Sequence, residues 1–175
     1  SRFKDLLKTQ KEYTKIKAFN LFVDWKKNSA NNLYKILKKT KITKDFEILS
    51  IDIDSFDLDV WKSLIHYRPK IVIIEINSGI APGILQTHSE NTTGNSFTST
   101  INYAKKNGYE LVCHTGNCIF IKKKYLNKIK LKKKYIQKPE LLFDKTWLYK
   151  RENILKKIIV KILPNKILDY LRKLK

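Results

Sequence analysis

Residues 45–57 read DFEILSIDIDSFD. An apolar run typical of a buried strand ends there in a cluster of carboxylates, and a helical pattern follows. A second apolar run, KIVIIEIN at residues 70–77, comes after that helix and also ends in polar side chains. Two strands joined by a helix predict a parallel pair. The carboxyl ends of such strands form the crevice where α/β folds bind ligands, so we expect an enzyme-type site there.

Hydrophobic periodicity and turn residues predict the other elements. Helices are expected at residues 3–13, 30–39, 58–66 and 97–107, and strands at residues 16–23, 47–53, 71–76, 109–114 and 118–122. This alternation predicts an α/β fold with a Rossmann-like, mostly parallel sheet and an antiparallel C-terminal hairpin. Residues 78–95 form a long polar loop, and such a loop in a compact domain is usually functional.

The chain divides into residues 1–125, which carry the α/β pattern, and residues 126–175, a basic helical extension. Apolar residues recur at helical spacing in residues 151–175, and six of the remaining positions are lysine. One interpretation packs this extension on the domain with its lysines in solvent. The other lays it on an anionic membrane surface.

The formal net charge is +21, yet residues 51–121 carry seven acidic and five basic residues. The expected site therefore lies in a mildly acidic middle between two basic flanks. Only four of the 37 basic residues are arginine, the side chain that base readout favours, so we do not expect nucleic acid as a partner. No apolar run approaches membrane-spanning length, and we expect a cytoplasmic protein that could lie peripherally at the inner membrane face.

The stretches 48–61, 66–77 and 107–112 together resemble class I S-adenosylmethionine-dependent methyltransferases, and most closely the FkbM-like group. That group carries an Asp-x-Glu-Gly type motif after its fourth strand. Asp52 matches the Asp, Asp54 stands in place of Glu, and Ser55 departs from Gly. Glu75 matches the acidic residue of the fifth strand. The resemblance covers roughly residues 16–125.

The resemblance implies that this chain is truncated at its N-terminus. The family's first strand with its glycine-rich loop, and its second strand with a ribose-binding acid, would precede Ser1, since all five glycines lie after the fourth strand. Those parts would hold most of the S-adenosylmethionine. Within this chain the resemblance assigns cofactor binding to Asp24, which follows the strand predicted at residues 16–23.

Methyl transfer to a hydroxyl needs its proton removed, or its oxygen held by a metal. We assign the catalytic role to Asp52, Glu75 and His88, and acceptor binding to Asp54, Asn77 and Asn95. Asp52 and Asn77 offer the oxygen ligands that Mg²⁺ prefers. An alternative for Asp54 and Asp57 is helix capping.

The leading hypothesis is an S-adenosylmethionine-dependent methyltransferase, or part of one, that acts on a sugar or similar hydroxyl acceptor, either a small molecule or a glycan. The alternative is a non-catalytic basic module on a methyltransferase-like scaffold that binds RNA or an anionic membrane. A continuous lysine face over residues 122–175 would favour that module.

Overall fold

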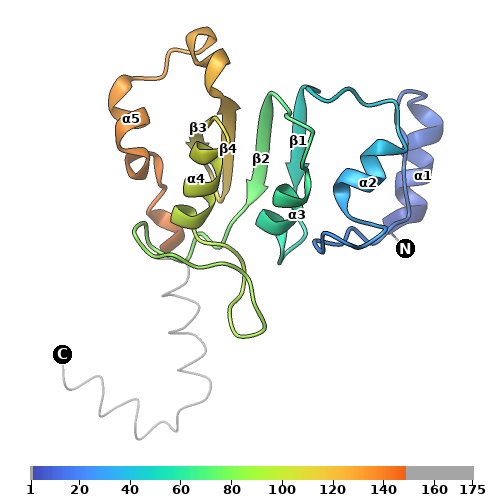
Figure 1. Cartoon of the computed structure of the whole chain (residues 1–175), viewed down its shortest axis with the longest axis horizontal. Coiled ribbons are helices and arrows are strands. Elements are labelled where there is room, and N and C mark those ends of the chain that lie inside the picture. Colours follow the sequence, from blue (N-terminus) through green and yellow to red (C-terminus); the bar gives the residue numbers. More distant parts are fainter. Residues whose placement is uncertain (1, 149–175) are drawn as a thin grey trace, which may run out of the picture.

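The computed structural model describes residues 2–148 (Figure 1). Its helices and strands follow the chain as α1 (Arg2–Glu12), α2 (Leu33–Lys38), β1 (Ile48–Ile51), α3 (Asp57–Ser63), β2 (Ile71–Glu75), α4 (Phe97–Lys106), β3 (Tyr109–His114), β4 (Asn117–Lys122), η1 (Lys123–Lys128), α5 (Lys133–Gln137) and η2 (Pro139–Leu142). The four predicted helices are confirmed, as are four of the five predicted strands. The α/β class is therefore confirmed.

The four strands form one sheet in the order β1-β2-β4-β3. β1 and β2 pair in parallel, whereas β4 pairs antiparallel with both β2 and β3. The sheet is therefore mixed, and the prediction of a mostly parallel sheet is wrong in its pairing. The cause is the C-terminal hairpin, whose second strand inserts between β2 and β3. Because β1, β2 and β3 still run in one direction, their carboxyl ends lie at the same side of the sheet.

One face of the sheet carries the hydrophobic core. Its central strands contribute side chains with no exposed surface, namely Val72, Ile74, Cys118 and Phe120. Trp61 of α3 packs edge-on against Tyr103 of α4, with ring centroids 5.2 Å apart, and also contacts Phe120. Helices α3 and α4 therefore cover this face together (Figure 1).

The opposite face of the sheet is apolar but less buried. Ile71 and Ile73 alternate with the core residues of β2 and are half-buried, and Ile48 on the edge strand β1 is 55% exposed. The described residues cover these side chains only in part. The β-branched residues on both faces of residues 71–76 predict burial on both sides, whereas the structure buries one face fully and the other only in part.

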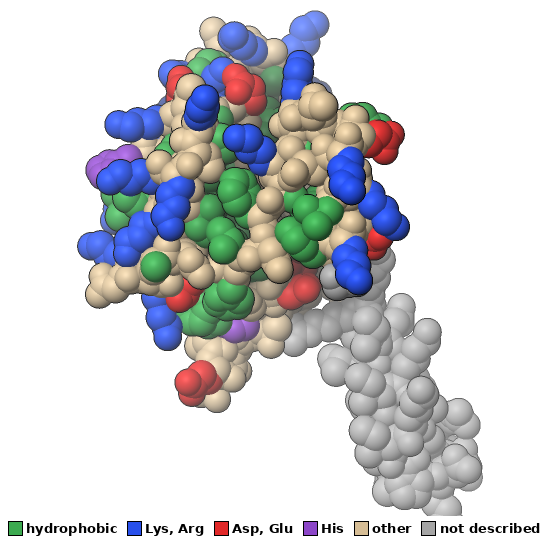
Figure 2. All heavy atoms as spheres, turned by 90° about the vertical axis from the view of Figure 1, so that its right-hand side faces the viewer, with side chains coloured by type: hydrophobic (Ala, Val, Ile, Leu, Met, Phe, Trp, Pro, Cys, Tyr) green, Lys and Arg blue, Asp and Glu red, His purple; other side chains and the backbone are tan. Residues whose placement is uncertain are grey.

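The strand predicted at residues 16–23 is wrong: the segment between α1 and α2 is turn and coil. Phe22 in this segment is 71% exposed. The segment pairs with none of the described strands, and β1 remains the edge of the sheet. Trp25 instead anchors the segment by stacking on Phe56, with centroids 3.6 Å apart. Figure 2 shows this side of the molecule, where hydrophobic side chains lie exposed among lysines.

Residues 123–148 pack on the α/β domain. Phe143 is 6% exposed and joins the main core, where its ring lies 5.0 Å from that of Phe97 in α4. The amphipathic pattern of residues 151–175 lies outside the described residues. Within residues 2–148, no helix has the length and apolar character needed to span a membrane.

Candidate functional site

Asp57 builds the loop that follows β1. Its carboxylate accepts hydrogen bonds from the backbone N–H groups of Ile53 at 2.9 Å and Ser55 at 3.1 Å. The residue is 2% exposed, and burial, helped by the charge of Asp52, raises the pKa of its carboxyl although both hydrogen bonds oppose that shift. Asp57 is the first residue of α3, so its carboxylate ties the loop together rather than capping the helix as the alternative for Asp57 supposed.

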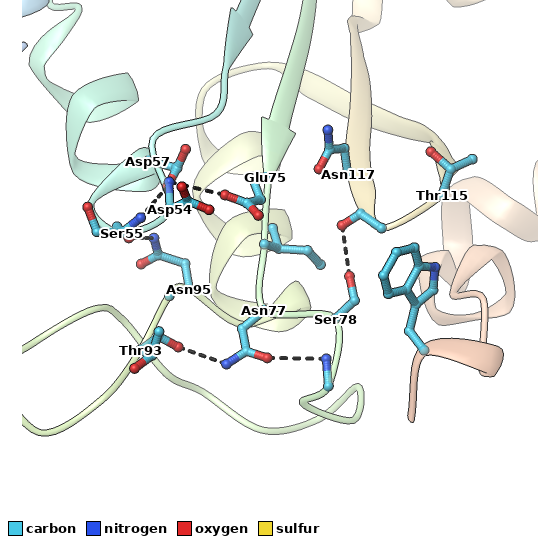
Figure 3. A pocket seen from close by; sticks show the side chains of 15 residues that line it. Asp54, Ser55, Asp57, Glu75, Asn77, Ser78, Thr93, Asn95, Thr115 and Asn117 are labelled. Atoms are coloured by element: carbon cyan, nitrogen blue, oxygen red, sulfur yellow. Dashed lines mark hydrogen bonds between the residues drawn. The ribbon is translucent and has the colours of Figure 1, made fainter. Parts of the chain in front are cut away.

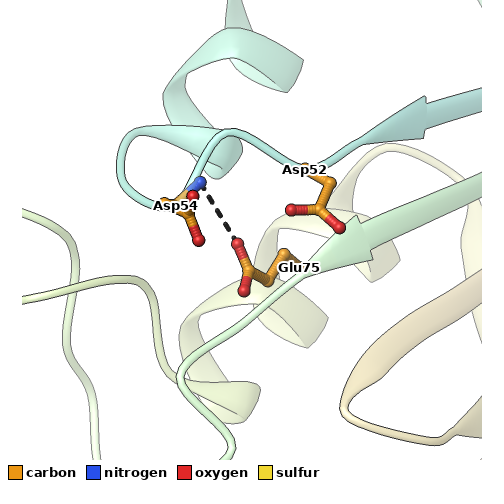
Figure 4. A group of neighbouring side chains, drawn as sticks. All are labelled: Asp52, Asp54 and Glu75. Carbon is orange, nitrogen blue, oxygen red and sulfur yellow. Dashed lines mark hydrogen bonds between the residues drawn. The ribbon is translucent and has the colours of Figure 1, made fainter. Parts of the chain in front are cut away.

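The loop brings three carboxylates together (Figure 4). Asp52 and Asp54 follow β1, Glu75 ends β2, and one carboxylate oxygen from each lies within 4.8 Å of the others. Asp54 adopts a left-handed φ of 61°, a conformation that Asp tolerates better than most residues, and its N–H donates to Glu75 Oε2 at 3.2 Å. The structure thus confirms that the acidic ends of the two strands meet.

Burial, followed by the charges of Asp52, Asp57 and Asp54, raises the pKa of Glu75. Glu75 is half-buried, whereas Asp52 and Asp54 are exposed. A carboxylate with a raised pKa accepts a proton more readily and is better suited to general base catalysis. Glu75 is therefore the best-placed base of the cluster.

The carboxylate cluster also has the chemistry of a site for a hard divalent cation, which prefers oxygen ligands. The sequence grouped Asp52 with Asn77 for this role, whereas the structure groups Asp52 with Asp54 and Glu75. Asn77 instead orders its own loop. Its Oδ1 accepts the N–H of Gly79 at 3.2 Å, and its Nδ2 donates to the carbonyl of Thr93 at 2.8 Å.

Asn77 and Asn95 join the two ends of the loop at residues 78–95 (Figure 3). The backbone N–H of Asn77 donates to the carbonyl of Asn95 at 2.8 Å. The Asn95 side chain is 1% exposed and accepts the N–H of His88 at 3.2 Å. Gly94 has a φ of 69°, and a Cβ there would lie 3.1 Å from Asn77 Cβ. Both predicted acceptor-binding amides are therefore also structural anchors of this loop.

His88 lies beside the candidate site and does not line the cavity at the carboxyl ends of the strands. Its Nδ1 accepts the N–H of Gly94 at 3.0 Å, so in the neutral ring the proton is on Nε2. The ring packs 4.2 Å from that of Phe56. Phe56 also stacks on Trp25, so His88, Phe56 and Trp25 form one aromatic cluster.

Asp24, the predicted cofactor-binding residue, lies in the turn that precedes α2. Its carboxylate accepts the N–H of Lys26 at 3.0 Å, and this hydrogen bond lowers the pKa of Asp24. Asp24 is not among the residues that line the cavity at the carboxyl ends of β1 and β2.

A cavity of about 640 Å³, within the usual size range of small-molecule sites, opens at the carboxyl ends of β1 and β2. Polar side chains dominate one part of its wall, namely Asp54, Asp57, Glu75, Asn77, Asn95 and Asn117. None of the described residues that line it is lysine or arginine. In a chain of net charge +21, this cavity is a local negative site.

The sequence pattern did not predict the far wall of the cavity, which is formed by Ser78, Thr115, Gly116, Asn117 and Trp147. Asn117 pairs with Glu75 in the antiparallel register of β2 and β4, so both side chains lie on the same face of the sheet. The sequence feature that could have indicated this wall is the Thr115-Gly116 turn of the hairpin. That turn follows β3, whose carboxyl end lies at the same side as the site. Nothing in the sequence pattern indicates Trp147.

Ser78 and His114 form a buried serine–histidine pair like that of some hydrolase active sites. The hydrogen bond between them, however, runs in the opposite direction. Ser78 Oγ donates to the carbonyl of Gly116 at 2.8 Å, and His114 Nε2 lies 2.9 Å from the same oxygen. The N–H of Asp144 donates to His114 Nδ1 at 3.0 Å, so the ring proton is on Nε2. His114 therefore donates to Ser78 and cannot take its proton, as a serine nucleophile would require.

Comparisons of this chain with protein-family models, with curated proteins and with solved structures find no match.

Proposed function

We propose that this chain is the acceptor-binding and catalytic part of an S-adenosylmethionine-dependent methyltransferase that acts on a hydroxyl group. The observation that carries the proposal is the acidic cavity. Carboxylates from the ends of two parallel strands line it, and no basic residue does so among the described lining residues. This supports the role that the sequence resemblance gives to the same strand ends.

The charge of the cavity favours a positively charged ligand over an anionic one. Asp54, Asp57 and Glu75 would repel phosphate groups and attract a sulfonium centre. S-Adenosylmethionine carries such a centre, and the cofactor supplies an electrophilic methyl group when bound. RNA and nucleotide-linked substrates fit this cavity poorly on the same grounds.

Glu75 would accept the proton of the acceptor hydroxyl as its O–H bond breaks and the O–C bond to the methyl group forms, while the methyl–sulfur bond would break and leave a neutral thioether. Its raised pKa suits this role. Asp52 and Asp54 would hold the acceptor hydroxyl, or a Mg²⁺ ion that binds it, through their exposed carboxylates. His88 would act through the loop that it packs against, since its Nδ1 is engaged by Gly94.

The basic binding module remains the alternative, and the lysine face that it predicts over residues 122–175 lies in part outside the described residues. On the face shown in Figure 2, lysine and arginine side chains are spread around the surface and hydrophobic side chains lie between them. A phosphate-binding surface would gather these charges along one track.

The test is methyl transfer from labelled S-adenosylmethionine to hydroxyl acceptors by the full-length protein, including any residues that its coding sequence places before Ser1. We expect Asp52→Ala to lose turnover without loss of folding, because Asp52 is exposed. Asp59→Ala removes a half-buried acid that is paired with Lys62 and lies outside the carboxylate cluster, and it is the control. Unchanged turnover in Asp52→Ala would refute the role of that carboxylate.

A further inference from the structure

The indole of Trp147 forms part of the cavity wall next to the hairpin turn. It packs so closely on Gly116 that a Cβ built on that glycine would lie 2.5 Å from Trp147 Cζ2. Gly116 also has a φ of 97°, which side-chain-bearing residues rarely adopt. Only glycine therefore allows the indole to occupy this position.

A chain of hydrogen bonds fixes the segment that carries Trp147. Asp144 accepts the N–H of Thr146 at 2.9 Å through its carboxylate, and its own N–H donates to His114. His114 donates to Ser78, which in turn donates to the carbonyl of Gly116. Phe143 stacks on the His114 ring, with centroids 4.6 Å apart. The buried Ser78–His114 pair thus ties the Trp147 segment to the turn on which the indole packs.

The indole shares the cavity with groups that bind hydroxyls. Glu75 and Asn117 are register partners on one sheet face, and Asn117 is the chain neighbour of Gly116, on which the indole packs. Carboxylate and amide groups bind hydroxyls in pairs as acceptors and donors. The C–H groups of a sugar ring carry partial positive charge and are attracted to the negative face of an aromatic ring.

We infer that Trp147 is a specificity-determining residue that packs against the sugar ring of a neutral saccharide acceptor, while Glu75 and Asn117 bind its hydroxyls. The inference rests on the proposed function and names the chemistry of its acceptor. It also gives residues 123–148 a function in acceptor choice, since they deliver Trp147 to the cavity.

The test is saccharide binding, which needs no methyl donor. Saturation-transfer NMR of the full chain would use the methyl glycosides of glucose, galactose, mannose and rhamnose as probes. We expect at least one probe to bind the natural chain, and Trp147→Leu to weaken that binding at least about tenfold. Trp147→Phe keeps an aromatic ring and should retain part of the affinity.

The matched control is Phe22→Leu, which removes an aromatic ring that is 71% exposed and outside the cavity. It should bind the probes as the natural chain does. Circular dichroism would check that each variant is folded. Equal affinity in folded Trp147→Leu, or binding of no probe by the natural chain, would overturn the inference. Methyl transfer to another hydroxyl acceptor would at the same time leave the proposed function standing.

Discussion

The backbone N–H of Asp54 donates a hydrogen bond to the carboxylate of Glu75 at 3.2 Å, although both residues are acidic and end different strands. The left-handed φ of Asp54 points this N–H at Glu75 while its side chain joins the same cluster. The N–H dipole of Asp54 therefore offsets part of the repulsion among the three neighbouring carboxylates. Like charges that the fold keeps close together despite their repulsion are typical of functional sites.

Glu75→Gln should keep the fold and remove turnover. Since the pKa of Glu75 is raised in the folded protein, its ionisation destabilises the fold, and stability falls as the pH rises from the unfolded-state value of about 4.5 through the folded-state value. The glutamine variant should lack this decrease and melt at the same or a higher temperature at neutral pH. Its turnover should fall by about 10²–10⁴-fold if Glu75 is the base. Melting curves and methyl-transfer rates give both values, and retained turnover would exclude Glu75 as the base.

Asp57→Asn should destabilise the protein by about 1–3 kcal/mol, because an amide can replace only one of the two buried acceptors for the N–H groups of Ile53 and Ser55. Urea unfolding measures this loss. Asp59→Asn breaks a partly exposed ion pair with Lys62 and should cost less than about 1 kcal/mol. Equal losses in the two variants would show that Asp57 does not hold the loop.

Gly94→Ala should destabilise the loop at residues 78–95 more than Gly83→Ala does. Both glycines have positive φ, at 69° and 97°, so both substitutions carry a backbone cost of about 1–2 kcal/mol. A Cβ at Gly83 meets nothing within 4 Å, whereas one at Gly94 lies 3.1 Å from Asn77 Cβ. Hydrogen exchange of the loop amides should therefore increase more in Gly94→Ala. Equal exchange in the two variants would contradict the close approach of Asn77.

His114 should make stability depend on pH. Burial lowers the pKa of His114, and the nearby charge of Asp144 opposes this shift only in part. The unfolded chain therefore binds a proton first, so the free energy of unfolding should decrease as the pH falls from about 6.5 through the folded-state pKa, by at most about 1.4 kcal/mol per pH unit. Protonation also puts a hydrogen on His114 Nδ1. That nitrogen then can no longer accept the hydrogen bond from the N–H of Asp144.

His114→Gln does not titrate in this range and should flatten that part of the profile. Urea midpoints for both proteins between pH 5 and pH 8 measure the difference. Parallel profiles would show that His114 does not carry this dependence.

Local sequence signals predicted the helices and the hairpin because local contacts determine them. Ser96, a residue type common at helix starts, caps α4 through the N–H of Ser99, and Gly108, a residue type common at helix ends, follows it with a φ of 79°. The helix predicted to begin after Ser29 begins later, at Leu33, because the Asn32 side chain accepts the N–H of Lys35 and caps it. Competing caps three residues apart are hard to rank from sequence alone.

The sequence predicted the carboxylates of the site but not the opposite wall of the cavity, which contains Trp147. Strand ends in a parallel pair place Asp52, Asp54 and Glu75 together by topology alone. Trp147 reaches the cavity only through the tertiary packing of Phe143 and His114. The false strand at residues 16–23 has a related cause, since strand preference depends on packing against cross-strand neighbours, and this segment pairs with none of the described strands.

The most direct test of the central claim is calorimetric titration of the full-length protein with S-adenosylmethionine and with S-adenosylhomocysteine, which lacks the sulfonium charge. We predict that S-adenosylmethionine binds, that it binds more tightly than S-adenosylhomocysteine, and that Glu75→Gln reduces this preference. Absence of binding to the folded protein, or equal affinity for both compounds in the natural protein, would contradict a sulfonium site at these carboxylates.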